Sequence, residues 1–400
     1  MNVVALRRFP AENRPVPVDC AVAEVTVFDD MATAEGPWRA LEGSGSLATP
    51  YQGYDFLNHW QAHLGADAGM TPAIVVAFNP ARIPLLLLPL GVRRVGGLRA
   101  LEFLGGKHAN FNMGLWRRDV AATIGATDLR GMMRELSSRA DLLMLTAQPL
   151  TWGGVTNPMA LLPHQRSANN GFSCALIPDF EALLRARTNS ATRKKMKKKE
   201  RGLAGMGEVR FERASDPRQV NRVLDAFFKQ KSARMRLLGQ PDVFADPAVR
   251  RFIAAVAEPN SKRVAPAELY ALSVDDMIVA TMGGIVAGGR FCAMFNSIHG
   301  GRYAAESPGE QLIVRLVKDC CERGLDAFDL GVGQSRYKHL FCEDAEPLFD
   351  SYLPLTAAAQ LPALAFRAGA SAKRMLKEHP ALWSTVRSLR RLRGRIVSLG

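Results

Sequence analysis

Three strand-like segments follow one another closely in the second half of the sequence, and this meander is the feature that most restricts the fold. The first two segments meet at the turn-forming pair Asp275-Asp276. A helical pattern runs from Pro308 to Arg323 after the third, and Gly324 suits its C-terminal end. Strands joined this closely pair antiparallel, so the meander predicts a sheet with a helix packed against it. The three segments are Leu269–Val274, Met277–Val286 and Phe291–Ile298.

The first half of the chain repeats this order of elements. Both halves run from a strand through helices to a strand meander, a helix and a last strand, without visible residue identity between them. The order predicts an α+β protein with two similar domains, each a mixed, largely antiparallel sheet flanked by helices. In the first half we expect strands at Ala21–Phe28, Ala73–Phe78, Ile83–Leu90, Leu101–Leu104 and Leu142–Thr146, and helices at Pro50–Leu64 and Leu129–Arg139. In the second half we expect further strands at Val209–Arg213 and Phe328–Leu330, and helices at Pro217–Ser232 and Pro247–Ala257.

The length of 400 residues exceeds what one hydrophobic core usually supports, so two domains are expected. Residues 1–20 contain three prolines and little periodicity, which predicts a flexible lead-in. We place an N-terminal domain at residues 21–170, a C-terminal domain at 171–355 and a basic helical tail at 356–400. The longest apolar stretch, Ile83–Val92, is shorter than a membrane span, and the sequence does not begin like a secretory signal. A cytoplasmic location is therefore expected.

The cysteines and histidines do not suggest a metal site. The six cysteines contain no CxxC pair, and the seven histidines are scattered along the chain. Cys320 and Cys321 are adjacent, and adjacent residues cannot easily share one metal tetrahedron. We predict no metal, and we expect the cysteines to be buried as small hydrophobic residues.

Positive charge is concentrated in two segments of the chain. Residues 193–201 carry a net charge of +6 and residues 356–400 a net charge of +8, which together equal the formal charge of +14 of the whole chain. A basic excess confined to two patches indicates an anionic partner more strongly than a diffuse excess would. The alternative is a pair of solvated faces that aid solubility, and it is the better interpretation for the tail.

Four stretches of the sequence carry a resemblance to a known family through their order and spacing. They are Ser190–Arg201, Phe227–Gly239, Glu306–Leu312 and Phe328–Phe341. Together they resemble the CelD/BcsL-like proteins, GNAT-type acetyltransferases linked to bacterial cellulose and exopolysaccharide production. That family is similar in turn to the FemAB-like transferases, which have two GNAT-like halves and use aminoacyl-tRNA donors. The resemblance covers roughly residues 35–355 and is strongest in the second half.

The resemblance implies an acyltransferase of the N- or O-acetyltransferase type that uses acyl-CoA, such as acetyl-CoA, as its donor. The acceptor would be an amine or hydroxyl of an envelope or exopolysaccharide-related sugar, lipid or peptide precursor. The basic tail would allow the protein to contact the anionic inner face of a membrane. Two alternatives stay open: a FemAB-like transferase with an aminoacyl-tRNA donor, and a non-catalytic GNAT-like component of polysaccharide assembly.

Residues 307–311 form the expected donor site. GNAT-like folds place donor phosphates at the N-terminus of the helix after the meander, where free N–H groups and the helix dipole attract anions. Ser307 suits the N-cap, Pro308 the first helical residue, and Gly309 leaves room for a close approach. Glu310 and Gln311 complete the segment. A capping box of Ser307 with Glu310 is the alternative, because the GNAT glycine pattern is incomplete here.

Basic residues on two helical segments are the expected substrate contacts. Arg193 and Lys197 lie one turn apart on one face of the basic helix, where such a row could bind phosphates of a donor or acceptor. Lys231, Arg234 and Arg236 look exposed near the end of the next long helix, close to a loop. A solvated surface is the alternative for each of these residues.

The catalytic residues are expected between Phe328 and Phe341. Asp329 would end an apolar strand beside a glycine-rich turn, where partial burial can turn a carboxylate into a base. Tyr337 could protonate a leaving thiolate, and Lys338 could hold a carboxylate or phosphate. The alternative makes Asp329 a turn cap and Tyr337 a packed aromatic residue.

Overall fold

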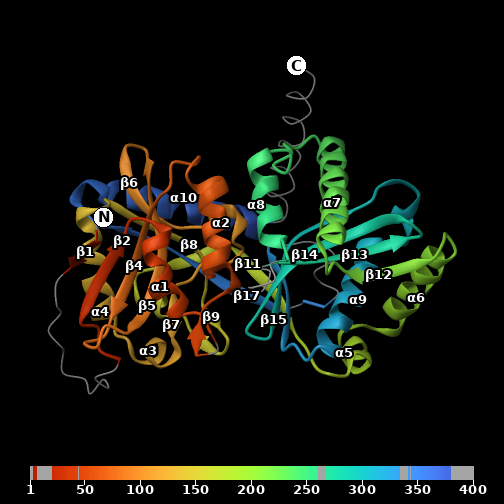
Figure 1. Cartoon of the computed structure of the whole chain (residues 1–400), viewed down its shortest axis with the longest axis horizontal. Coiled ribbons are helices and arrows are strands. Elements are labelled where there is room, and N and C mark those ends of the chain that lie inside the picture. Colours follow the sequence, from red (N-terminus) through yellow and green to blue (C-terminus); the bar gives the residue numbers. More distant parts are fainter. Residues whose placement is uncertain are drawn as a thin grey trace. The chain divides into compact units, whose positions relative to one another are not determined.

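The chain forms two compact units in a computed structural model that describes residues 3–6, 20–43, 45–259, 267–333, 341–342 and 344–379 (Figure 1). Unit 1 consists of Met1–Asn170 and Glu346–Glu378, and unit 2 of Gly171–Ala345 with His379–Gly400. Most of the expected lead-in and residues 380–400 of the expected tail lie outside the described residues. Residues 346–378, which the sequence analysis divided between the second domain and the tail, belong to unit 1.

Unit 1 is built on a sheet with the strand order β1-β2-β4-β5-β6-β8-β17. Neighbouring strands pair antiparallel, except that β6 and β8 pair in parallel. The strands are β1 (Val3–Leu6), β2 (Glu24–Phe28), β4 (Thr71–Phe78), β5 (Pro84–Val95), β6 (Leu98–Phe103), β8 (Leu142–Pro149) and β17 (Asp344–Pro354). The α-helices are α1 (Met31–Ala40), α2 (Tyr54–Trp60), α3 (Arg118–Thr123), α4 (Ala126–Glu135) and α10 (Gln360–Glu378). The short strands are β3 (Ser46–Leu47), β7 (Leu115–Arg117), β9 (Thr151–Trp152) and β10 (Val155–Thr156).

Unit 2 is built on a sheet with the strand order β11-β16-β15-β14-β13-β12. The predicted meander is present as three antiparallel strands, and β15 continues the sheet by pairing in parallel with β16 from Arg290↔Ala327 to Cys292↔Asp329. Helices α7 and α9 both pack against β14 and β15. The strands are β11 (Gln165–Ala175), β12 (Val209–Arg213), β13 (Glu268–Val274), β14 (Met277–Ala287), β15 (Arg290–Ile298) and β16 (Ala327–Val332). The helices are α5 (Phe180–Arg187), α6 (Ser190–Ala204), α7 (Pro217–Leu238), α8 (Pro247–Ala257) and α9 (Pro308–Glu322).

Local sequence signals set the ends of the helices in unit 2. Asn189 caps α6 by accepting a hydrogen bond from the backbone N–H of Thr192, and Asp216 caps α7 in the same way. Helix α7 ends at Gly239, whose φ of 59° is the left-handed conformation that glycine adopts readily. It runs past the predicted end at Ser232 because no glycine or proline interrupts the sequence before Gly239.

The predicted fold class is confirmed, because each unit is a mixed, mostly antiparallel sheet flanked by helices. The order β2-α1-α2-β4-β5-β6-α4-β8 in unit 1 matches β12-α7-α8-β13-β14-β15-α9-β16 in unit 2. Strands β11 and β17 were not predicted from the sequence; they add an antiparallel neighbour to β16 and β8 respectively. Polar residues interrupt both strands, so neither shows a clear apolar period.

Candidate functional site

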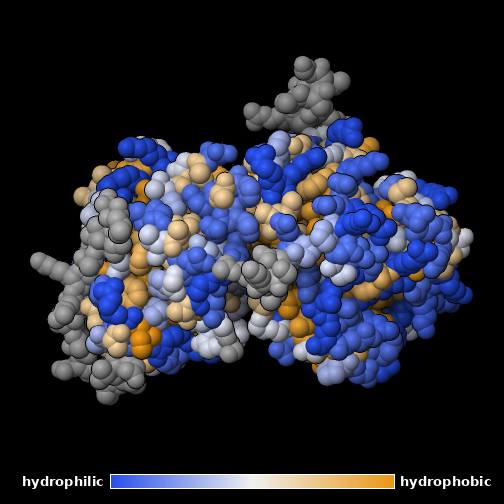
Figure 2. All heavy atoms as spheres, in the orientation of Figure 1, coloured by the Kyte–Doolittle hydropathy of each residue, from blue (hydrophilic) through white to orange (hydrophobic). Residues whose placement is uncertain are grey.

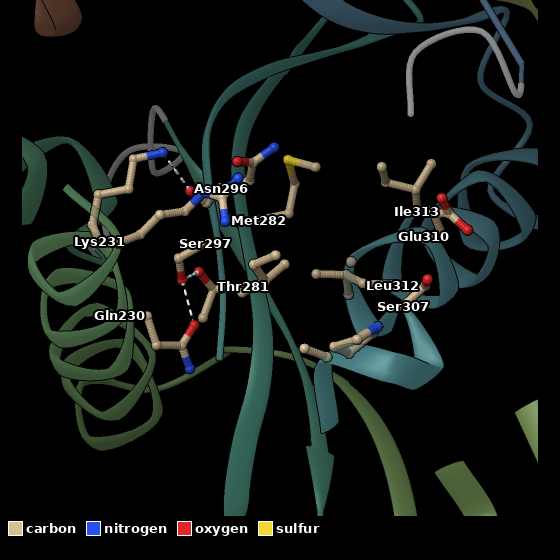
Figure 3. Close-up of a pocket in the computed structure, with 15 residues that line it drawn as sticks. Gln230, Lys231, Thr281, Met282, Asn296, Ser297, Ser307, Glu310, Leu312 and Ile313 are labelled. Atoms are coloured by element: carbon tan, nitrogen blue, oxygen red, sulfur yellow. Dashed lines mark hydrogen bonds between the residues drawn. The ribbon is translucent and has the colours of Figure 1, made fainter. Parts of the chain in front are cut away.

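Two cavities of unit 2 share a wall at the N-terminus of α9. The first has a volume of about 390 Å³ and is lined by residues of α7, β14, β15 and α9 (Figure 3). The second has a volume of about 760 Å³ and is lined by residues of α5, α6 and α9. Ser307 and Glu310 line both cavities, so the start of α9 is the place where the two meet.

Ser307 precedes α9 in a left-handed backbone conformation, with φ 49° and ψ 57°, that residues other than glycine rarely adopt. Its side chain makes no hydrogen bond to the first turn, so the capping box with Glu310, the alternative to a donor site, is absent. The hydroxyl of Ser307 instead accepts a hydrogen bond from the ammonium group of Lys199 on α6. The ammonium group and the N–H groups at the start of α9 thus bring positive charge to one point, which favours an anion there.

The second cavity is a basic groove, and we use this name for it below. Its lining contains eight basic side chains but three acidic ones, an excess that attracts polyanions. Hydrophilic side chains also gather on the surface over α5 and α6 (Figure 2). The basic residues are Arg185, Arg193, Lys194, Lys197, Lys199, Arg201, Arg315 and Lys318, and the acidic residues are Glu181, Glu200 and Glu310.

The structure brings several of the expected site residues together. Arg193 and Lys197 both line the basic groove, with Gln311 on the opposite helix. Arg193 is partly engaged in the fold, because its guanidinium group donates a hydrogen bond to the backbone carbonyl of Thr188. Lys197 is exposed and is therefore the freer of the two cations.

The first cavity contains Lys231 and Arg234 from the second set of expected substrate contacts, whereas Arg236 lines neither cavity. Lys231 Nζ donates a hydrogen bond to the backbone carbonyl oxygen of Asn296 at 2.9 Å (Figure 3). Burial lowers the pKa of Lys231, the nearby charge of Arg234 lowers it further, and Asp242 opposes the shift. A lysine with a lowered pKa is neutral over a wider pH range, and a neutral amine can accept a proton.

A chain of hydrogen bonds joins α7 to β14 and β15 beside Lys231. Gln230 Nε2 donates to the carbonyl of Ile278 at 2.7 Å, so its Oε1 accepts the proton of the Ser297 hydroxyl, also at 2.7 Å. Thr281 must then donate to Ser297, since the two hydroxyl oxygens are 2.7 Å apart and Ser297 has used its proton. These three buried polar side chains are satisfied within the protein, which fixes the floor of the first cavity.

Gly309 and Gln311 have packing roles that the sequence patterns do not indicate. A Cβ atom at Gly309 would lie 2.8 Å from Ile298 Cγ2, so glycine allows α9 to approach β15 closely. Gln311 Nε2 donates to the carbonyls of Lys199 at 3.1 Å and Glu306 at 2.9 Å, which ties α6 to the start of α9. Substitution of either residue would disturb packing as well as any bound donor. Pro308 is buried as the first residue of the helix.

Asp329 lines neither cavity, although it was the expected base. Its carboxylate is fully buried and forms an ion pair with Arg290, whose Nε donates to Oδ2 at 3.1 Å. The backbone N–H of Gly331 donates to its other oxygen. These contacts give Asp329 a structural partner on each side. Tyr337 and Lys338 lie outside the described residues.

Lys199, Gln230 and Asn296 are site residues that sequence reasoning missed. Lys199 belongs to the basic run, but its contact with Ser307 depends on how α6 packs on α9. Gln230 had a usable signal, since it is a polar residue on the apolar face that α7 buries. Asn296 accepts the hydrogen bond of Lys231 through its backbone carbonyl. Every residue has such a carbonyl, so the residue type does not indicate this contact.

All six cysteines are buried and free of disulfide bonds. Within the described part of the chain, no group of three or more His, Cys, Asp or Glu side chains could hold a metal ion. The helices in that same part include none that is long and apolar enough to span a membrane.

Comparisons with known proteins agree with this architecture. Residues 190–339 match the sequence profile of a family described as an acetyltransferase (GNAT) domain. The crystal structure of FemX is similar to this chain, with a TM-score of 0.52 at 11% identity, over 80% of this chain and 99% of that chain. The structure of L-PGS from Bacillus licheniformis gives a TM-score of 0.45 at 10% identity, over 80% and 97% of the two chains. No curated protein matches the sequence.

The family match covers both cavities, since their lining residues lie between Phe180 and Lys318 and nearly all fall within 190–339. The similarity to FemX shows a shared fold. The chain therefore contains a GNAT-type acetyltransferase domain in unit 2 and is an enzyme that transfers acyl groups.

Proposed function

We propose that unit 2 transfers an acyl group from acyl-CoA to an amine or hydroxyl of an acceptor related to the cell envelope or to exopolysaccharide, as the resemblance to CelD/BcsL-like proteins implies. The observation that carries the donor assignment is the meeting of Lys199 with the N-terminus of α9 at the wall between the two cavities. A diphosphate there would contact an ammonium group and the positive end of a helix of 15 residues.

The two cavities suit the two ends of such a donor. The basic groove provides charge for the phosphates of CoA. The first cavity has apolar side chains that suit an acyl chain, Met282 from β14 and Leu312 and Ile313 from α9, and Lys231 lines it from the α7 side (Figure 3). In acyl transfer the acceptor attacks the thioester carbonyl, the C–S bond breaks, and a base takes the proton that the acceptor loses. We propose Lys231 as that base.

An aminoacyl-tRNA donor is the second candidate, and the size of the basic groove favours it. Eight basic side chains are more than one diphosphate needs, and several phosphates of an RNA strand could use them. Acetyl-CoA, longer acyl-CoAs and aminoacyl-tRNA should therefore be compared as ligands in the same binding experiment.

Ser307→Asp tests the donor site, because it should change stability and affinity in opposite directions. A carboxylate at this position would pair with Lys199 and with the dipole of α9, so we expect a gain of about 0.3–1 kcal/mol in stability. The same carboxylate would repel donor phosphates and weaken the binding of acetyl-CoA, measured by calorimetry, about tenfold or more. Aspartate and asparagine both tolerate the left-handed backbone of Ser307.

Ser307→Asn is the matched control, since it has the same shape without the charge. It should bind acetyl-CoA nearly as well as the unmodified protein. Equal affinity of the Asp and Asn variants for every donor in the comparison would contradict a phosphate site at the start of α9.

Charge reversal in the basic groove should weaken donor binding in a salt-dependent way. Lys194→Glu with Lys197→Glu changes two lining residues, and we expect about a tenfold loss of affinity in low salt that shrinks as salt is added. Lys195→Glu with Lys198→Glu is the control, because these residues lie on the same helix but do not line the groove. Titrations at several salt concentrations give both results. Equal losses in the two pairs would indicate general attraction by a basic helix.

A further inference from the structure

Unit 1 contains a cavity of its own, with a volume of about 410 Å³, between β8, β17, α10 and the first residues of β11, which belong to unit 1 as far as Asn170. Its lining is polar on the strands, with Thr146, Ser167, Asn169, Asp350 and Tyr352. The lining from α10 is small or aromatic, with Lys373 as its basic residue; the other α10 residues are Ala365, Phe366, Gly369 and Ala370. A Cβ atom at Gly369 would meet nothing within 4 Å, so this side of the cavity is open.

A buried carboxylate is the unusual feature of this cavity. Asp350 is only 6% exposed, yet no ion pair joins it to a cation anywhere in the part of the chain that the structure describes. Burial raises the pKa of Asp350, and hydrogen bonds from the N–H of Ala147 and from Ser167 oppose the shift in part. A buried carboxylate without a direct ion pair is costly, and a cation that enters the cavity and contacts it would remove much of that cost.

The backbone opposite Asp350, at Ala147, has a strained conformation that holds the Asp350 carboxylate at the cavity. Strand β8 has an irregular register opposite Asp350, and Ala147 there has a φ of 58° in the left-handed region. Its N–H donates to Asp350 Oδ1 at 2.9 Å, and its carbonyl accepts from the N–H of Asn112 at 3.0 Å. A neutral acceptor such as asparagine would satisfy the same N–H without burying a charge. The carboxylate thus does more than the fold of the strand requires.

The other side chains that line the cavity limit the chemistry of the rest of the ligand. Lys373 also lines the cavity and influences Asp350 only through its field, so a ligand must keep its positive charge near Asp350 and present oxygen atoms toward Lys373. Asn169, Thr146 and Tyr352 can exchange hydrogen bonds with hydroxyl groups. The rings of Tyr352 and Phe366 lie parallel, with centroids 6.2 Å apart, and give one apolar wall.

We propose that this cavity binds a small molecule that carries a protonated primary amine next to hydroxyl groups, with an amino sugar such as glucosamine as the simplest example. The ammonium group would contact Asp350, and the hydroxyl groups would face the polar strand residues and Lys373. The site lies entirely within unit 1 and does not depend on the acyl transfer proposed for unit 2.

Calorimetry on the full chain with three probes tests this site. Glucosamine should bind, and glucose, which has the same ring without the amine, should bind at least about tenfold more weakly. Ethanolamine, which has the amine without the ring, should also bind more weakly than glucosamine. Equal binding of glucosamine and glucose would overturn the role of Asp350, and ethanolamine binding as tightly as glucosamine would overturn the recognition of ring hydroxyls.

Two variants connect the binding to the cavity. Asp350→Asn keeps an acceptor for Ala147 and should reduce glucosamine affinity roughly 10- to 100-fold, to the level of glucose. Gly369→Met should place a long side chain at the cavity and block binding of all three probes, while Ala368→Met, at the neighbouring exposed position outside the lining, should leave binding unchanged. The Met pair decides the question even if Asp350→Asn does not fold. Unchanged glucosamine affinity in Gly369→Met would place the ligand elsewhere and overturn the proposal.

Discussion

Lys231→Met is expected to lower the turnover of acyl transfer by about 100-fold to 10,000-fold, the usual effect of removing a group that transfers a proton. Lys231 lines the first cavity, and burial lowers its pKa below the value of 10.5 for a free lysine. Its neutral amine is therefore available at a lower pH than that of an exposed lysine. Turnover of the unmodified protein should rise with pH through this lowered pKa, and the rise should be missing in Lys231→Met.

The stability of the same variant separates catalysis from packing. The pKa of Lys231 is lower in the folded state than in the unfolded state, so folding is less favourable when this lysine must carry its charge. This destabilisation is complete at pH values below the folded-state pKa. It is lost as the pH rises from the folded-state pKa to the unfolded-state pKa. Replacing it with a methionine of similar length should not lower the melting temperature at neutral pH. Lys229→Met, at an exposed position of α7 that lines neither cavity, is the matched control and should keep full turnover. Full turnover in a stably folded Lys231→Met would rule out Lys231 as the base.

Asp329→Asn should lower the stability of the protein more than its catalysis, and we expect the free energy of unfolding to fall by about 3–5 kcal/mol. The Asp329 side chain is 0% exposed and its partner Arg290 is 14% exposed, so the substitution removes a charged partner from a largely buried guanidinium group. Urea denaturation measures the loss. Activity should fall only in proportion to the fraction of folded protein, because Asp329 lines neither cavity.

An exposed pair in the same unit provides the control for this prediction. Glu208 and Arg210 form an ion pair whose side chains are 66% and 54% exposed, and Glu208→Gln should leave stability unchanged within error. A stably folded Asp329→Asn that loses turnover far more than folded protein would contradict a purely structural role and support the prediction of a catalytic carboxylate.

The sequence predicted where the donor segment and the basic row lie, but not the contacts that their side chains make. The donor segment at 307–311 and the row of Arg193 and Lys197 were expected, and they line cavities that meet at Ser307. The alternative interpretation, a capping box of Ser307 with Glu310, was wrong, because the left-handed backbone of Ser307 turns its hydroxyl to Lys199 instead of to the first turn of α9. The sequence shows the charge of these residues, but it does not show which residues they contact.

The sequence by itself determined the secondary structure of the second half, from Val209–Arg213 to the helix that begins at Pro308. These elements depend on apolar periodicity, capping residues and turn glycines, all of which act within a few positions of one another. The positions of the cavities and the burial of Asp329 were decided only by the tertiary structure. Lys199 and Ser307 are 108 residues apart in the chain, and Arg290 and Asp329 are 39 apart. Contacts of that kind depend on how helices and strands pack, and local sequence patterns do not record which distant residue will supply the partner.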